Sequence, residues 1–99
     1  MIRHILLVKF KSKAGSKAIL EVLKNFEAIP SKIDGLSSVE WGENNSLEKL
    51  SDDFSRCIQM TFESEAARQH YLPHPAHEAL KDKFIDVLEK IVVFDYTVP

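Results

Sequence analysis

The chain has 99 residues, of which 44% are hydrophobic and 28% are charged, and its formal net charge is -2 at pH 7. This length supports one domain over residues 1–99, and the composition is that of a globular protein rather than a disordered chain. The slight negative charge offers no basic surface, which counts against binding to nucleic acid or to an anionic membrane.

Targeting and redox features both favour the cytoplasm. The apolar residues near the N-terminus form too short a run for a signal peptide, and charged residues interrupt that run. No stretch approaches the roughly 20 apolar residues that a membrane-spanning helix needs. The single cysteine, Cys57, has no partner for an internal disulfide, so we expect a reducing, cytoplasmic environment.

The first predicted elements are a strand from Ile2 to Lys11 and a helix from about Lys17 to Ile29. Alternate residues of the strand point to opposite faces, and both faces are apolar in the middle, so both should be at least partly covered. His4 lies on the more apolar face. The helix carries a stripe of apolar side chains at helical spacing and ends near Pro30.

Two further strands are predicted from Leu36 to Glu43 and from Phe54 to Phe62, with a polar, acidic loop between them. A helix from Glu65 to Leu72 and a longer helix from about Ala76 to Lys90 follow, and the chain ends in a strand from Ile91 to Val98. Two prolines separate the helices, because proline stops a helix that leads into it and is favoured in the first turn of the next.

This order of elements predicts an α+β, ferredoxin-like β-α-β-β-α-β fold, with an antiparallel four-stranded sheet and its helices on one face. The other face would expose apolar side chains from several strands, among them Leu7 and Val93. A monomer of this size rarely tolerates such a patch. We therefore expect a homodimer whose two sheets pack face to face, which a monomeric mass at micromolar concentration would contradict.

Short motifs along nearly the whole chain resemble the stress-responsive A/B barrel (Dabb) domain family of the dimeric α+β barrel superfamily. In chain order these motifs are Ile2-Arg3-His4-Ile5 with Lys9-Phe10, Trp41-Gly42-Glu43-Asn44, Thr61-Phe62-Glu63-Ser64, Tyr71 with His74-Pro75-Ala76-His77, and Val93-Phe94-Asp95-Tyr96. The resemblance implies a ferredoxin-like fold that dimerises into an α+β barrel. It leaves the activity open, because the family includes plant stress proteins and polyketide cyclases that use no cofactor.

The resemblance also implies site residues. In the cyclases, the residues that match Tyr71 and His77 act as an acid–base pair in a pocket, and the residue that matches His4 lines that pocket. Two positions depart from the cyclase pattern: a histidine is common where this chain has Arg56, and a tyrosine of the cyclase pocket falls at Phe26. The departures leave the substrate open.

The candidate catalytic residues are His77, as a base, and Tyr71, as a donor to a developing oxyanion. Pro75 can open the second helix, which places His74 near its start and His77 in its first turn. The partial positive charge of a helix N-terminus favours a neutral imidazole there. The structural alternative is that His77 caps its helix and Tyr71 packs in the core.

The candidate binding residues are His4, Arg56, Phe26 and His74. His4 and Arg56 are polar groups on apolar strand faces, so they either line a polar pocket or satisfy each other or another polar neighbour. Arg56 is suited to clamp the carboxylate or phenolate of a ligand. The alternative for Arg56 is a salt bridge to Asp52, Asp53 or Glu40.

No metal site and no cofactor are expected. Three histidines near the prolines have usable spacings, but nothing completes the three or four ligands that zinc needs. The resemblance keeps open a divalent cation near the dimer interface, which some family members carry. The sequence thus predicts a homodimer with a pocket for a small apolar or phenolic ligand. The pocket serves either binding without catalysis or acid–base catalysis of the cyclase type, and a monooxygenase is a third reading by analogy with other dimeric α+β barrels.

Overall fold

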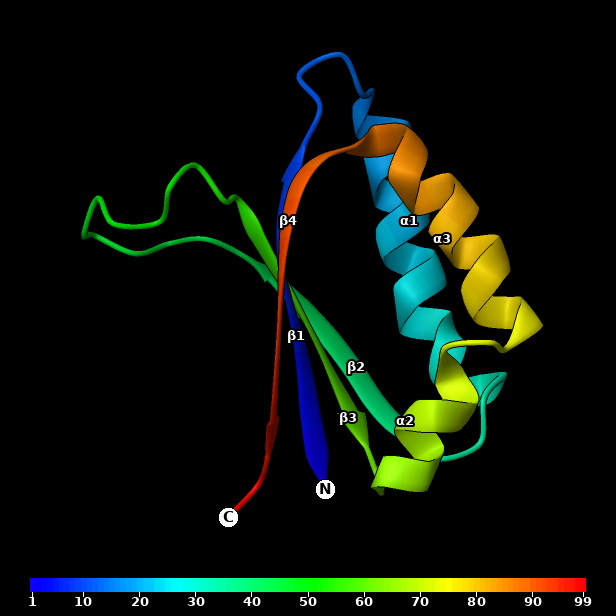
Figure 1. Cartoon of the computed structure of the whole chain (residues 1–99). Coiled ribbons are helices and arrows are strands. Elements are labelled where there is room, and N and C mark those ends of the chain that lie inside the picture. The colour runs from blue at the N-terminus through cyan, green and yellow to red at the C-terminus, as the bar shows by residue number, and fades with distance from the viewer.

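The computed structural model describes all 99 residues, Met1–Pro99, as a sheet with its helices on one side (Figure 1). The strands are β1 (Ile2–Phe10), β2 (Leu36–Glu43), β3 (Arg56–Phe62) and β4 (Leu88–Thr97). The helices are α1 (Ser16–Ala28), α2 (Glu65–Tyr71) and α3 (Pro75–Val87), and a 3-10 turn covers Ile29–Ser31. No helix is both long enough and apolar enough to cross a membrane.

The four strands lie in the order β2-β3-β1-β4, and each neighbouring pair is antiparallel. The two β-α-β units therefore interleave. Strand β1 lies in the middle of the sheet, and β4 lies beside it at one edge. This arrangement confirms the ferredoxin-like prediction. Figure 1 shows all three helices on the same face of the sheet, while the opposite face is uncovered.

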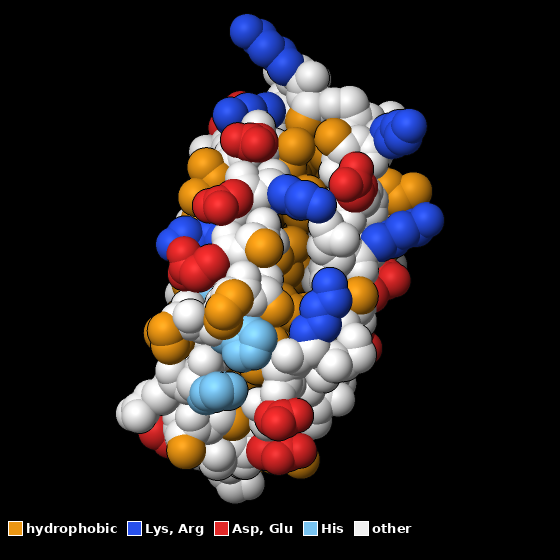
Figure 2. All heavy atoms as spheres, turned by 90° about the vertical axis from the view of Figure 1, so that its right-hand side faces the viewer, with side chains coloured by type: hydrophobic (Ala, Val, Ile, Leu, Met, Phe, Trp, Pro, Cys, Tyr) orange, Lys and Arg blue, Asp and Glu red, His pale blue; other side chains and the backbone are white.

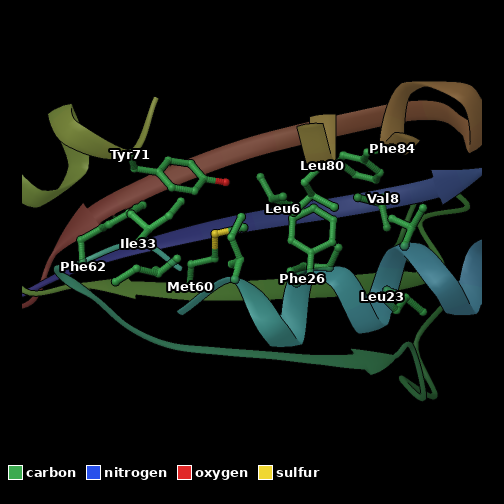
Figure 3. Packing of buried hydrophobic residues seen from close by; sticks show 14 of the residues in the cluster. Leu6, Val8, Leu23, Phe26, Ile33, Met60, Phe62, Tyr71, Leu80 and Phe84 are labelled. Carbon is green, nitrogen blue, oxygen red and sulfur yellow. The ribbon is translucent and has the colours of Figure 1, made fainter. Parts of the chain in front are cut away.

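The core fills the space between the sheet and helices α1 and α3 (Figure 3). It takes alternate residues from the two central strands, because successive strand side chains point to opposite faces. From the strands the buried residues include Ile2, Leu6, Val8, Phe10, Ile58, Met60 and Phe62. From the two helices they are Val22, Leu23, Phe26, Leu80, Phe84 and Val87. The more apolar face of the first strand, which carries His4, is thus the face that packs against the helices.

The boundary between the last helix and the last strand lies earlier in the chain than the sequence pattern predicts. Helix α3 ends at Val87, and Leu88 already has an extended backbone, with φ -88° and ψ 129°. Leu88 pairs with Phe10 on β1, so strand hydrogen bonding begins there rather than at Ile91. The prediction that the helix continues to Lys90 was wrong, because pairing with β1 overrides the local helical pattern.

The open face of the sheet is apolar along β1 and β4. Leu7 lies opposite Val92, and Ile5 lies opposite Phe94. Phe94 is 61% exposed, which is unusual for so large an apolar side chain. Val93 was expected on this face, but it pairs with the buried Leu6 and faces the helices instead.

Candidate functional site

A cavity of about 350 Å³ lies between the sheet and the α2–α3 corner. Ten of its 13 lining residues are hydrophobic, which is the usual composition of a small-molecule site. The lining consists of His4, Leu6, Phe26, Tyr71, Leu72, His77, Leu80, Lys81, Phe84, Ile85, Leu88, Ile91 and Val93. Figure 2 shows the outer surface of the helical layer, with apolar side chains in a groove between charges of both signs and histidines near one end; the cavity lies between this layer and the sheet. Four of the predicted site residues, His4, Phe26, Tyr71 and His77, meet here.

Tyr71 is the last residue of α2, and it is 2% exposed. Its ring centre lies 4.3 Å from that of His77 and 5.1 Å from that of Phe62. The hydroxyl points away from its own helix toward Leu6 and Leu80 (Figure 3), where Tyr71 borders the open space of the cavity. Burial raises the pKa of the Tyr71 phenol well above its usual value, so the group stays protonated and can donate.

His77 lies in the first turn of α3, where its Nδ1 is 2.9 Å from the Leu72 carbonyl oxygen. A carbonyl oxygen only accepts, so Nδ1 carries the hydrogen of this bond. A neutral His77 therefore keeps its free lone pair on Nε2, as a proton acceptor requires. The predicted break between the helices creates this geometry, because the turn after Tyr71 brings the Leu72 carbonyl back toward the start of α3.

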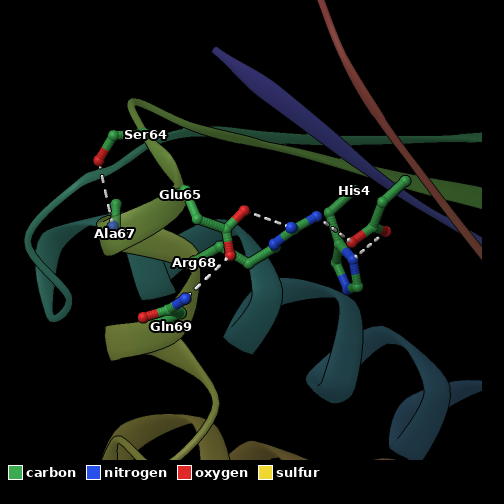
Figure 4. A network of polar contacts seen from close by, with 7 residues as sticks. His4, Ser64, Glu65, Ala67, Arg68 and Gln69 are labelled. Carbon is green, nitrogen blue, oxygen red and sulfur yellow. Dashed lines mark hydrogen bonds and ion pairs between the residues drawn. The ribbon is translucent and has the colours of Figure 1, made fainter.

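His4 enters the cavity from β1 and is held by Asp95, which belongs to the last of the family motifs, and through Asp95 by Arg68, which the sequence patterns did not single out. Its Nδ1 lies 2.6 Å from Oδ1 of Asp95, which is the residue of β4 directly opposite His4. The other Asp95 oxygen accepts a hydrogen bond from Arg68 of α2 at 3.3 Å, and Arg68 also pairs with Glu65 (Figure 4). The network fixes the orientation of the His4 ring, and it ties α2 to the edge strand of the sheet.

Lys81 is a polar lining residue that sequence reasoning missed. It follows His77 by four residues on α3, and this spacing places two side chains on the same face of a helix. The spacing was visible in the sequence, but only the structure shows that this face borders a cavity rather than solvent.

Arg56 does not reach this cavity. It lies opposite Val8 on β1, whereas His4 lies opposite Met60, four residues further along β3. At about 3.3 Å per residue, that separation is roughly 13 Å. Arg56 instead pairs with Glu43 at 3.2 Å and stacks over Phe10, with 5.5 Å between the guanidinium carbon and the ring centre. Arg56 thus forms a salt bridge, as the alternative to a binding role predicted. Its partner is Glu43, however, and not Asp52, Asp53 or Glu40.

His74 also stands outside the cavity. Its Nδ1 accepts a hydrogen bond from the Ala76 backbone N–H at 3.0 Å, so it is the N-cap of α3, and Pro75 follows in the first turn. The cap expected of His77 is thus provided by His74. No group of three or more His, Cys, Asp and Glu side chains is arranged to hold a metal ion.

A larger depression of about 680 Å³ lies beside the loop between β2 and β3. Only one of its ten lining residues is hydrophobic. It lacks the apolar lining that small-molecule sites usually have. The cavity beside Tyr71 and His77 is therefore the candidate functional site.

The antiparallel sheet, the helices on one of its faces and the apolar cavity beside the break between α2 and α3 define a small α+β domain with a ferredoxin-like fold. The family model described as "Stress responsive A/B Barrel Domain" matches residues 2–98, and the chain belongs to this family. A stress-response A/B barrel domain-containing protein, HS1, from Arabidopsis thaliana is 32% identical over 96% of this chain and 87% of its own length. Olivetolic acid cyclase from Cannabis sativa is 28% identical over 97% of this chain and 95% of its own length.

Solved structures agree with this assignment. The crystal structure of At3g17210 from Arabidopsis thaliana has a TM-score of 0.94 at 30% identity, over 100% of this chain and 96% of that one. A hydroxynitrile lyase from Passiflora edulis has a TM-score of 0.93 at 24% identity, over 99% and 93%. A dimeric ferredoxin-like protein from Jannaschia sp. CCS1 has a TM-score of 0.86 at 21% identity, over 98% of each chain. The last two similarities concern the fold alone.

Proposed function

We propose that this protein binds a small, mostly apolar carbonyl compound in the cavity and performs acid–base chemistry on it with its own side chains. One observation carries the proposal: the rings of Tyr71 and His77 are 4.3 Å apart in a single open cavity. Phe26, Leu80 and Phe84 were the residues most able to fill that space. They form its wall instead, and about 350 Å³ remains.

The proposed reaction starts with removal of a proton from the carbon next to the carbonyl. His77 Nε2 takes this proton, because its Nδ1 hydrogen is committed to the Leu72 carbonyl. Tyr71 donates a hydrogen bond to the oxygen on which negative charge develops, and burial keeps the phenol protonated for this role. His4, oriented by Asp95, adds a polar contact on the opposite wall. The similarity to olivetolic acid cyclase supports the reaction class.

Binding without catalysis is the second candidate function, and the mostly apolar lining of the cavity favours it. The two candidates differ in what His77 does. As a base, His77 is dispensable for folding and essential for turnover. As a structural residue, it secures the Leu72 carbonyl at the helix break, so its loss would destabilise the corner.

A His77→Ala variant tests the proposal against a panel of small β-polyketides and keto acids. We expect turnover to disappear while the melting temperature stays within a few degrees of the wild type. The matched control is His70→Ala, which removes an exposed histidine of α2 that does not line the cavity. Unchanged turnover in His77→Ala, or a large loss of stability without a specific loss of turnover, would contradict a catalytic role.

We also infer a homodimer in which the open sheet faces pack together. The exposed apolar residues of β1 and β4, with Phe94 at 61% exposure, support this assembly, as does the dimer named for the Jannaschia relative. A Phe94→Glu variant should halve the mass measured by sedimentation equilibrium. Leu47→Glu, a substitution in an exposed loop, should not. The cytoplasmic location remains a prediction, which cell fractionation tests.

A further inference from the structure

The polar side chains that line the cavity include a cation but no anion. Three of its 13 lining residues are not hydrophobic: His4, His77 and Lys81. No Asp or Glu lines the wall. The nearest carboxylate behind it, that of Asp95, is already engaged by His4 and Arg68. The wall therefore presents one permanent cation, and no anion, to whatever fills the cavity.

The position of Lys81 relates it directly to the catalytic pair. His77 and Lys81 are four residues apart on α3, so their Cβ atoms lie about 5–6 Å apart on one face. The Lys81 side chain is about half exposed, whereas that of His77 is 17% exposed. Lys81 is thus the more solvent-exposed of the two, and its backbone lies one helical turn further along α3 than that of the proposed base.

Without a ligand, the ammonium group of Lys81 forms only a weak ion pair. Its ion-pair partner is Glu78, at 3.7 Å between Nζ and Oε2, and both side chains are about half exposed. A pair of this kind contributes little, because water screens it and the two long side chains lose freedom when they associate. The same Glu78 also lies 3.7 Å from His77 Nδ1 through its other oxygen. Glu78 is therefore a weak competitor that a ligand anion can displace.

We propose that the compound bound in the cavity is an apolar keto acid rather than a neutral ketone. Its carboxylate pairs with Lys81 at the mouth, its carbonyl lies between Tyr71 and His77, and its alkyl or aryl part fills the apolar interior. The spacing on α3 requires the carboxylate and the carbonyl to be separated by roughly one helical turn. This inference rests on the proposed function, because it places the reacting carbonyl at the same two residues.

Electrostatics favours this class over the alternatives. A cationic ligand would be repelled by Lys81, and no carboxylate lines the cavity to offset that repulsion. A neutral ligand would fill the apolar interior but gain nothing from the ammonium group. A carboxylate gains a charge-assisted hydrogen bond from Lys81, while the apolar part of the same ligand contacts lining residues such as Leu72 and Ile85.

The test compares two probes that differ in charge alone: 4-oxononanoate and its primary amide, 4-oxononanamide. Binding is measured by isothermal titration at low and high salt for the wild type and for Lys81→Gln, Glu78→Gln and Lys83→Gln. Lys83 is the matched control, because it is an exposed lysine of α3 that faces Glu21 and does not line the cavity. All three positions are exposed, so folding is checked by circular dichroism and is expected to be unchanged.

We expect the wild type to bind the acid about fivefold more tightly than the amide at low salt, with a smaller ratio at high salt. Lys81→Gln should abolish the preference through weaker binding of the acid, with the affinity for the amide unchanged. Glu78→Gln should increase the preference, because the competing anion is gone. Lys83→Gln should behave as the wild type.

Two other results separate the inference from the proposed function. Equal binding of acid and amide by the wild type, or a preference that survives Lys81→Gln, overturns the keto-acid assignment and leaves the carbonyl site intact. Failure of both probes to bind the wild type overturns the proposed function, and the keto-acid assignment with it.

Discussion

Replacing Tyr71 with phenylalanine removes one oxygen atom from the cavity and keeps the aromatic ring. That ring is 2% exposed, and its neighbours Phe62 and His77 have ring centres at 5.1 Å and 4.3 Å. The hydroxyl projects toward Leu6 and Leu80, which offer it no hydrogen-bonding side chain. The substitution therefore separates the chemical role of Tyr71 from its packing role.

The aromatic ring of Tyr71 and its hydroxyl should contribute very different amounts to the free energy of unfolding. Truncating a buried aromatic ring to alanine costs about 3–5 kcal/mol. Removing a hydroxyl that has no partner in the folded chain should change the free energy of unfolding by less than about 1 kcal/mol. In a chain of 99 residues, 1 kcal/mol corresponds to a shift of roughly 4–8 °C in melting temperature. By contrast, losing one donor to an oxyanion lowers turnover by about 100- to 1000-fold.

Urea denaturation and steady-state kinetics on the carbonyl substrate measure the two effects side by side. Tyr71→Phe should keep its stability and its affinity for apolar ligands, and lose nearly all turnover. A loss of stability above about 2 kcal/mol would mean that the hydroxyl has a structural partner in the assembled protein. Turnover at the wild-type level would remove Tyr71 from the mechanism.

Three further outcomes are expected. Burial raises the pKa of Tyr71 above the ordinary tyrosine value of about 10. The unfolded chain therefore loses this proton first as pH rises, and the free energy of unfolding should fall above about pH 10, more steeply in the wild type than in Tyr71→Phe. Asp95→Leu leaves His4 and Arg68 without their shared partner and should cost about 1–3 kcal/mol in urea denaturation. His74→Ala removes the cap of α3 and should cost about 0.5–2 kcal/mol by the same measurement, with ligand affinity unchanged.

The last two outcomes each have a control substitution of the same residue type. Asp86→Leu changes an exposed acidic residue of α3, and His70→Ala removes the ring that contacts His74 without removing the cap. Both should stay within about 0.5 kcal/mol of the wild type. If Asp95→Leu costs no more than Asp86→Leu, the His4–Asp95–Arg68 network contributes nothing to stability. If His74→Ala lowers ligand affinity, His74 belongs to the site after all.

The sequence alone determined the features that depend on neighbouring residues. Alternation along β1 and β3 showed which of their side chains share a face, and the two prolines identified the break that presents Tyr71 and His77 at one corner. Motif order along the chain identified the family. These patterns are local, with periods of two residues in strands and 3.6 in helices, so they can be read without knowing where the rest of the chain lies.

Only the tertiary structure decided which polar groups share the cavity. His4 and Asp95 are 91 residues apart in sequence, and the register between β1 and β4 brings them together. That register also ends α3 at Val87, since Leu88 is already paired with β1. Arg56 and His4 occupy the same sheet face, yet their positions along the strands separate them by roughly 13 Å. A side chain's face follows from its own segment, but its neighbours depend on how strands distant in the sequence align.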